Sequence, residues 1–207
     1  MELNELLEKV SAMYLKFGIK SVTMDDVAGE LLISKKTLYQ FVKDKNELVN
    51  GVIEQLIETD KSHYVSNIRS NVNAIEQLFD VHRHIRQIMS EVSTTARYDL
   101  KKYYPVQYAK LYQKKKEMML KSVTDNLEKG KKEGLFRENM TTIYIARFFV
   151  SRVESTIEMD ILLDKSIDEH KFFIEVFEYH IRGLATSKGL KFFEENIEQL
   201  KSFKHEK

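Results

Sequence analysis

The stretch "TMDDVAGELLISKKTLYQFVKDKNEL", residues 23–48, contains three helix starts and one very short helix. Thr23, with Asp26 three residues later, has the spacing of a capping box, which predicts that a helix begins after Thr23. Ser34 is a second predicted N-cap, and residues 35–41 provide about two helical turns. A helix, a tight turn and a two-turn helix are typical of a helix-turn-helix, in which the second helix enters the major groove of DNA.

The rest of the chain predicts an all-helical protein. It has 207 residues with only seven glycines and a single proline, Pro105, so few positions break a helix. The apolar residues recur at helical spacing throughout the chain. The predicted helices are residues 2–17, 24–31, 35–41, 45–69, 72–91, 94–102, 105–133, 141–163, 168–187 and 190–203.

Composition excludes several classes of protein. Cysteine is absent, which rules out disulfide frameworks, thiolate metal sites and a cysteine nucleophile. The formal net charge is +1, so a basic surface for nucleic acid must be local. The N-terminal sequence is acidic, unlike a secretory signal, and no apolar run approaches the roughly 20 residues of a membrane span. We therefore expect a cytoplasmic protein that has no contact with a membrane.

The short helix at residues 35–41 has a polar outer side. Leu38 and Phe41 must face inward, so the outward side chains are two lysines, a hydroxyl, a phenol and an amide, from Lys35, Lys36, Thr37, Tyr39 and Gln40. These groups suit phosphates and base edges. The same composition is ordinary for the solvated side of a small helical subdomain. The residues alone leave both interpretations open.

The longer stretch "GIKSVTMDDVAGELLISKKTLYQFVKDKNELV" resembles the DNA-binding region of the TetR family of bacterial transcriptional regulators. In that family a glycine ends the first helix, a threonine opens the second, and a Ser-x-x-Thr-Leu-Tyr run forms the recognition helix before a Lys-x-x-Leu start of the fourth. The residues that match in order and spacing are Gly18, Thr23, Ala28, Ser34, Thr37, Leu38, Tyr39, Lys45 and Leu48. The match covers about the first quarter of the chain.

The resemblance implies a set of DNA contacts. Thr23, Tyr39 and Lys45 are expected to hold phosphates, and the other side chains to lie at or near the bases. The full predicted set is Thr23, Ser34, Lys35, Lys36, Thr37, Tyr39, Gln40 and Lys45.

Two positions depart from the family pattern. Val42 stands where many members carry an aromatic residue, which bears on how the short helix packs and not on its exposed side. Leu32 stands in the turn where the family usually has glycine, and a left-handed leucine there costs about 1 to 2 kcal/mol. We expect either that the turn avoids a positive φ or that burial of Leu32 offsets the strain.

The resemblance also implies the organisation of the whole chain. It predicts an N-terminal three-helix helix-turn-helix DNA-binding domain, residues 1–48, followed by a larger helical effector-binding and dimerisation domain, residues 49–207. The last two long helices would pair with a second subunit, so that a homodimer reads a palindromic operator in double-stranded DNA. The predicted interface residues are Phe149, Val153, Ile157, Phe173, Val176, Phe177, Ile181 and Leu184. The same apolar residues would also suit the core of a monomer.

A small-molecule effector would release the DNA by favouring one state of the dimer. The candidate effector contacts, all from the middle helices, are His82, Arg86, Met89, Tyr108, Tyr112, Met118, Met119 and Arg152. Methionine and tyrosine suit a hydrophobic or aromatic molecule in an adaptable site. The residues by themselves favour an ordinary core or surface position for each member of this set. We expect a repressor, and the sequence leaves an activator open as the alternative.

Two other classes of protein are alternatives. A helical-bundle enzyme with a carboxylate-bridged metal needs Glu three residues before His, and no histidine here has that neighbour. The chain also lacks a phosphate-binding glycine loop and a serine elbow, so we expect neither an enzyme nor a bound metal or cofactor. A helical interaction protein that does not bind DNA would give the polar side of residues 35–41 no role.

Overall fold

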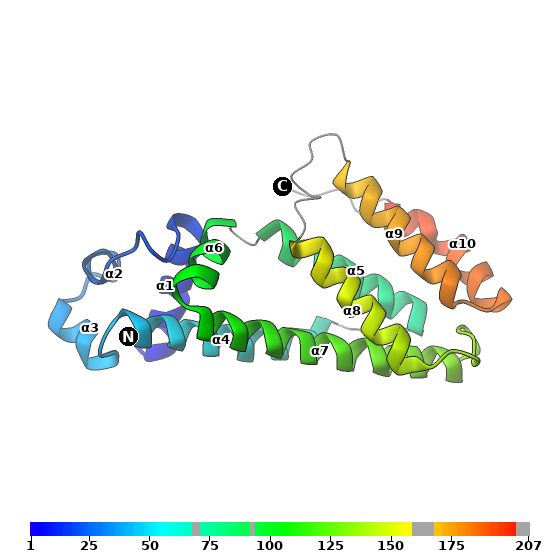
Figure 1. The fold of residues 1–207 in the computed structure, drawn as a ribbon, viewed down its shortest axis with the longest axis horizontal. Coiled ribbons are helices and arrows are strands. Elements are labelled where there is room, and N and C mark those ends of the chain that lie inside the picture. Colours follow the sequence, from blue (N-terminus) through cyan, green and yellow to red (C-terminus); the bar gives the residue numbers. More distant parts are fainter. Residues whose placement is uncertain (68–70, 92–93, 159–167, 202–207) are drawn as a thin grey trace. The chain divides into compact units, whose positions relative to one another are not determined.

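Helices account for all the regular secondary structure in the described part of the chain (Figure 1). This structure, a computed structural model, describes residues 1–67, 71–91, 94–158 and 168–201; within these it describes only the backbone at 61–67, 84–91, 94, 157–158, 169–170, 173 and 199–201. The helices are α1 (Leu3–Phe17), α2 (Met24–Glu30), α3 (Lys35–Phe41), α4 (Lys45–Asn67), α5 (Ala74–Glu91), α6 (Thr94–Tyr103), α7 (Pro105–Lys132), α8 (Thr142–Glu158), α9 (Glu169–Leu184) and α10 (Ser187–Lys201). The all-helical prediction is confirmed. No helix among the described residues is long and apolar enough to cross a membrane.

The predicted helix ends differ from the structure most clearly between α9 and α10. Helix α9 ends at Leu184, because Ala185 is extended, with φ −74° and ψ 148°. Thr186 then caps α10, since its Oγ1 accepts a hydrogen bond of 3.2 Å from the backbone N–H of Gly189. The last helix therefore begins three residues earlier than the sequence pattern predicted. The end of the helix predicted over 141–163 lies outside the described residues.

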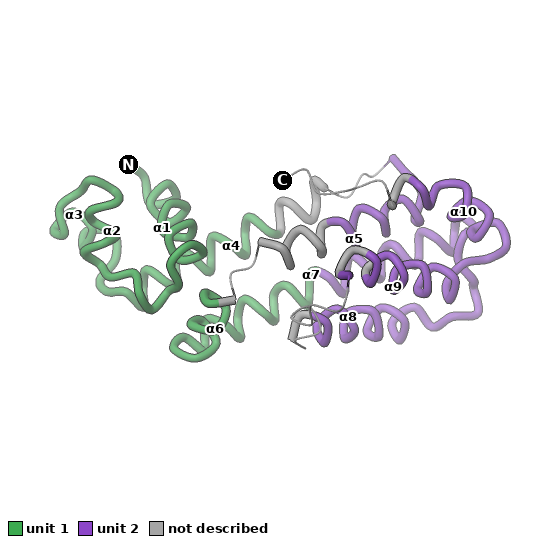
Figure 2. Tube along the Cα trace, turned by 90° about the horizontal axis from the view of Figure 1, so that it is seen from above, with its two compact units in different colours: residues 1–65, 90–118 green, residues 66–89, 119–207 purple. Residues whose placement is uncertain are grey.

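The chain forms two compact units (Figure 2). The first contains Met1–Val65 and Ser90–Met118, and the second contains Ser66–Met89 and Met119–Lys207. The unit that holds the predicted DNA-binding segment therefore also includes α6 and the first half of α7.

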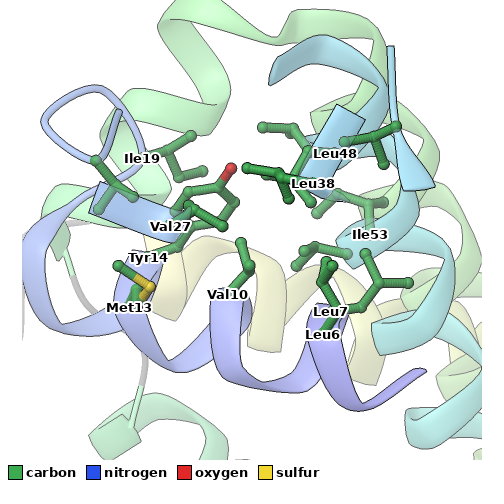
Figure 3. Packing of buried hydrophobic residues seen from close by; sticks show 14 of the residues in the cluster. Leu6, Leu7, Val10, Met13, Tyr14, Ile19, Val27, Leu38, Leu48 and Ile53 are labelled. Atoms are coloured by element: carbon green, nitrogen blue, oxygen red, sulfur yellow. The ribbon is translucent and has the colours of Figure 1, made fainter. Parts of the chain in front are cut away.

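The core of the first unit holds α3 in place from its inner side. Leu6, Val10 and Tyr14 of α1 point toward Leu38 of α3 and Leu48 of α4 (Figure 3). The side chains of Leu38 and Leu48 are fully buried. Burying a leucine contributes about 1.5 to 3 kcal/mol, so Leu38 is a strong anchor for a helix of only two turns.

The lysine-rich stretch of α7 lies along α4 and is largely paired. Lys115 Nζ lies 2.9 Å from Asp60 Oδ2, and Lys110 forms an ion pair with Glu54. Within α7, Lys114 forms an ion pair with Glu117. These pairs explain the lysines as a solvated helical surface.

The core of the second unit contains four buried phenylalanines, and backbone hydrogen bonds join two of its connections. Phe136, Phe149, Phe177 and Phe193 are each at most 2% exposed. The connection between α7 and α8 meets the connection between α9 and α10, where Phe136 and Ala185 form an isolated antiparallel bridge. Here the N–H of Arg137 donates to Leu184 O, and the N–H of Thr186 donates to Leu135 O, each over 2.9 Å. We call this pair of connections the clasp.

Candidate nucleic-acid interface

Helix α2 begins at a complete capping box. The Oγ1 of Thr23 accepts a hydrogen bond of 3.2 Å from the N–H of Asp26, and the N–H of Thr23 donates to Asp26 Oδ2 over 2.8 Å. The Thr23 hydroxyl also donates to Asp26 Oδ2 over 2.6 Å, and this bond, together with the one from the Thr23 N–H, lowers the pKa of Asp26. The cap predicted from the sequence is confirmed, and the polar end of Thr23 is engaged in holding the start of α2.

Helix α3 is capped by Ser34 and presents a polar outer surface. The Oγ of Ser34 accepts a 3.0 Å hydrogen bond from the N–H of Thr37. Lys36 and Gln40 are exposed, and Tyr39 is 48% exposed, whereas Leu38 faces the core. We call Lys36, Thr37, Tyr39 and Gln40 the α3 face.

Lys35 differs from the α3 face because it already has a partner. Its Nζ lies 2.5 Å from Oδ1 of Asp25 on α2, and the hydrogen bond to that carboxylate raises the pKa of Lys35. Both side chains are more than half exposed. An ion pair this exposed contributes little to stability, so the lysine can exchange the carboxylate for a phosphate at small cost.

Lys45 is half-buried at the start of α4. Its Nζ donates a hydrogen bond of 3.1 Å to the backbone oxygen of Lys20, three residues before Thr23. Burial lowers the pKa of Lys45. Two of the three predicted phosphate contacts, Thr23 and Lys45, are therefore joined through the connection between α1 and α2.

The turn between α2 and α3 contradicts both expectations for Leu32. This residue has φ +55°, in the left-handed region, and its side chain is 93% exposed. The turn does not avoid a positive φ, and burial does not offset the strain. The N–H of Leu32 donates to Gly29 O and the N–H of Ile33 donates to Ala28 O, so hydrogen bonds on both sides of the peptide fix the turn.

Sequence analysis missed the contribution of α6. Asp99 is 6% exposed, and its Oδ2 accepts a 2.8 Å hydrogen bond from the N–H of Lys20. The Nζ of Lys20 donates to the hydroxyl of Tyr103 over 3.1 Å. Helix α6 thus holds the connection that precedes α2. No local pattern could reveal it, because Lys20 and Asp99 are 79 positions apart.

The candidate effector residues belong to different parts of the structure. Tyr108 and Tyr112, whose rings stack with centroids 5.7 Å apart, lie in the first unit with Met118. His82, Met119 and Arg152 lie in the second unit. The side chains of Arg86 and Met89 lie outside the described part.

Arg152 is the most unusual member of this set. Its guanidinium carbon lies 5.1 Å from the ring centre of Phe149, and the imidazole of His180 lies 4.8 Å from the same ring centre. Among the described residues, neither Nε of Arg152 nor Nε2 of His180, both buried atoms, has a hydrogen-bond partner. Burial lowers the pKa of Arg152, and burial together with the positive charge of Arg152 lowers the pKa of His180 to about 3.

Most predicted subunit-interface residues are in the core of the second unit instead. Phe149, Val153, Phe177, Ile181 and Leu184 are each at most 7% exposed in a single chain. Val176 is half-buried, and the side chains of Ile157 and Phe173 are outside the described part. This corrects the assignment of those five residues, because the helical apolar stripe is used for packing within the chain. The exposed large apolar residues of α8 and α9 are others, namely Ile143, Tyr144, Phe148 and Tyr179.

Known proteins share this fold. No protein-family model matches the chain. A curated relative, the HTH-type transcriptional repressor KstR2 of Mycolicibacterium smegmatis, is 23% identical over 154 residues, covering 70% of this chain and 72% of the relative. The TetR family protein CprB from S. coelicolor A3(2) matches with a TM-score of 0.65 and 11% identity, over 98% of this chain and 100% of that chain. AibR, solved in complex with isovaleryl coenzyme A and operator DNA, matches with a TM-score of 0.53 and 15% identity, over 76% of this chain and 87% of that chain.

The two short capped helices α2 and α3 have the arrangement of a helix-turn-helix, and the curated relative is named as an HTH-type transcriptional repressor. These similarities show that the chain shares the fold of CprB, a TetR family protein, and that its sequence is similar to that of an HTH-type transcriptional repressor.

Proposed function

We propose that this protein is a cytoplasmic transcriptional repressor that binds a palindromic operator as a homodimer and leaves it when a small molecule binds. The observation that carries this proposal is the α3 face, of which Lys36, Tyr39 and Gln40 are exposed while Leu38 and the Ser34 cap fix the helix from behind. A helix that is fixed from behind presents its outer side chains at defined positions, which favours base readout by Lys36, Thr37 and Gln40. Tyr39, Lys45 and Thr23 would hold phosphates.

The relatives support the regulatory part of the proposal. KstR2 is a transcriptional repressor, and AibR was solved with both operator DNA and isovaleryl coenzyme A. In this proposal residues 1–48 bind DNA, and residues 49–207 carry the effector and dimer functions. The exposed Tyr144 and Phe148 of α8 and Tyr179 of α9 are the surface through which the subunits would pair.

The first experiment tests DNA recognition. A library of random-sequence duplexes is selected on the wild-type protein, and the enriched duplex is labelled with fluorescein for anisotropy titrations. The double variant Lys36→Ala, Tyr39→Ala should lose about tenfold or more in affinity for this duplex and approach the affinity for a scrambled one. The control Lys191→Ala removes an exposed charge from α10 and should bind like the wild type.

Two outcomes would oppose the proposal. If the selection enriches no sequence, the protein does not read DNA through this fold. If the double variant binds the enriched duplex as tightly as the wild type, recognition lies elsewhere than the α3 face.

The second experiment tests the dimer. Phe148→Glu places a charge on the exposed surface of α8 and should shift the protein from dimer to monomer in sedimentation velocity. The matched control is Tyr98→Glu on α6, which is similarly exposed but lies in the first unit. A wild-type protein that sediments as a monomer, or a Phe148→Glu variant that remains a dimer, would reject this surface.

A further inference from the structure

Arg152 and His180 contact the same aromatic ring from two different helices, and each carries a buried nitrogen atom. Arg152 is on α8 and His180 is on α9, and both lie about 5 Å from the ring centre of Phe149. In the described part of the chain, the buried Nε of Arg152 and the buried Nε2 of His180 find no acceptor or donor. The two groups therefore lie at one location, and each has a buried nitrogen atom that requires a hydrogen-bond partner.

Such an arrangement is costly when it serves packing alone. A buried polar atom without a partner costs about 1 to 3 kcal/mol, and more when the group is charged. Arg182 on α9, an arginine with an exposed side chain, shows the ordinary solution, since it binds Glu178 over 2.8 Å and Glu194 over 3.0 Å. Arg152 packs against the aromatic ring of Phe149 where Arg182 has carboxylate partners. A half-buried cation that packs against an aromatic ring in place of an anionic partner is typical of a ligand site.

We infer that Arg152 and His180 form the binding site for a small carboxylic acid with an apolar body. A carboxylate accepts two parallel hydrogen bonds from a guanidinium, one of them from Nε, which is the atom without a partner here. Neutral His180 can donate a third hydrogen bond from Nε2. Phe149, whose ring lies beside both groups, is nearly fully buried, so the remainder of the ligand must be apolar.

This inference rests on the proposed function, because the acid would be the effector, and it narrows the effector class. The methionines and tyrosines in the candidate set suggested a hydrophobic or aromatic molecule. Arg152 adds a requirement for a negative charge. Free acids and their coenzyme A thioesters both carry anionic groups, so a binding experiment must separate them.

Thermal unfolding of the full-length protein without DNA tests the site directly. The probes are straight-chain fatty acids of increasing length, benzoate and phenylacetate, each compared with the alcohol or amide of the same carbon skeleton. A third arm uses the coenzyme A thioesters of the same acids. We expect at least one free acid to raise the midpoint of unfolding of the wild type while its neutral counterpart does not.

The variant Arg152→Leu separates binding from packing. Removing an unpaired, half-buried charge should raise the unfolding midpoint in the absence of ligand, while the affinity for the acid falls about tenfold or more. If Arg152 had a merely structural role, Arg152→Leu would lower the unfolding midpoint instead. Arg152→Lys keeps the positive charge but loses the planar guanidinium that donates two parallel hydrogen bonds, so it should recover part of the affinity. The control Arg182→Leu, on exposed α9 surface, should leave the ligand response unchanged.

Three results would overturn the inference. They are no response of the wild type to any acid in the panel, an equal response to the neutral counterparts, and an undiminished response of Arg152→Leu. A response to thioesters alone would also reject the free acid as ligand. Because this assay contains no DNA, its failure is separate from failure of operator binding, which the anisotropy titrations measure.

Discussion

The backbone N–H of Lys20 donates a hydrogen bond of 2.8 Å to the Oδ2 of Asp99, and this bond fixes the connection before α2 to a helix much later in the chain. The same connection offers its Lys20 carbonyl to the ammonium group of Lys45. Gly18 lies against Asp99 as well, since a Cβ at residue 18 would lie 3.0 Å from Asp99 Oδ2. One buried carboxylate therefore organises the region from which Thr23 and Lys45 would reach DNA.

Replacing Asp99 should weaken both folding and DNA binding. Asp99→Ala leaves the Lys20 N–H without its acceptor, which we expect to lower the free energy of unfolding by about 1 to 2 kcal/mol. Binding to the selected duplex should weaken because Thr23 and Lys45 lose their common support. Urea unfolding and anisotropy measure the two effects. Asp99→Asn retains an acceptor and should show less of both, and Asp125→Ala, at an exposed ion pair, should show neither.

Leu32 predicts a stabilising substitution. Leu32→Gly removes about 1 to 2 kcal/mol of left-handed strain and adds about 0.5 to 1 kcal/mol of chain entropy cost, so the free energy of unfolding should rise by about 0.5 to 1 kcal/mol. Leu32→Ala keeps the strain and loses only an exposed side chain, so it should be near neutral. If urea unfolding finds both variants equally stable, the left-handed turn is not the source of the effect.

Two glycines in the second unit should respond to alanine with opposite signs. A Cβ at Gly130 would lie 1.9 Å from Cδ2 of Phe136, so Gly130→Ala overpacks the core and should cost about 1 to 3 kcal/mol. Gly183 on α9 has nothing within 4 Å of its Cβ position. Gly183→Ala should gain a few tenths of a kcal/mol, up to about 1, from helix propensity. Thermal unfolding of the two variants measures both changes in stability. A loss of stability in Gly183→Ala would show that this part of α9 needs the glycine.

His180 predicts how stability depends on pH. Its pKa is about 3 in the folded chain, against about 6.5 when unfolded, so the unfolded state binds more protons between these values. Stability from this group is present above pH 6.5 and is lost as the pH falls toward 3. The loss between pH 6.5 and 5 should be roughly 1 to 2 kcal/mol. Most carboxylates titrate below this window.

The variant His180→Leu isolates this contribution. Its free energy of unfolding, measured with urea at several pH values, should fall less than that of the wild type between pH 6.5 and 5. Parallel curves for the two proteins would mean that the acid lability comes from other groups.

The sequence predicted elements whose signals are local. Thr23 and Ser34 cap the helices that follow them because a cap depends on residues three positions apart. Leu38 was correctly expected to face inward, since helical spacing determines the side of a short helix.

Contacts between distant residues could not be predicted in this way. Periodicity showed that Phe149 and Phe177 lie on apolar stripes, but an apolar stripe fits a core and a subunit interface equally well. The structure assigns both residues to the core. Asp99 gave no signal, because its partner is distant in the sequence. Arg152 was chosen for its location on a middle helix, and only the arrangement around Phe149 distinguishes it from the other candidates.

The clasp in the second unit can tolerate many changes of sequence. Connections between helices usually vary most among related chains. Here the bonds from Arg137 and Thr186 are made by backbone atoms, so most side chains at these positions would leave them intact. Gly189 is an exception, because a Cβ there would lie 2.2 Å from Leu135 O. Because backbone hydrogen bonds form this junction, it can hold the ends of several helices together while the residues change. Related proteins could therefore keep the junction with little sequence identity at these positions.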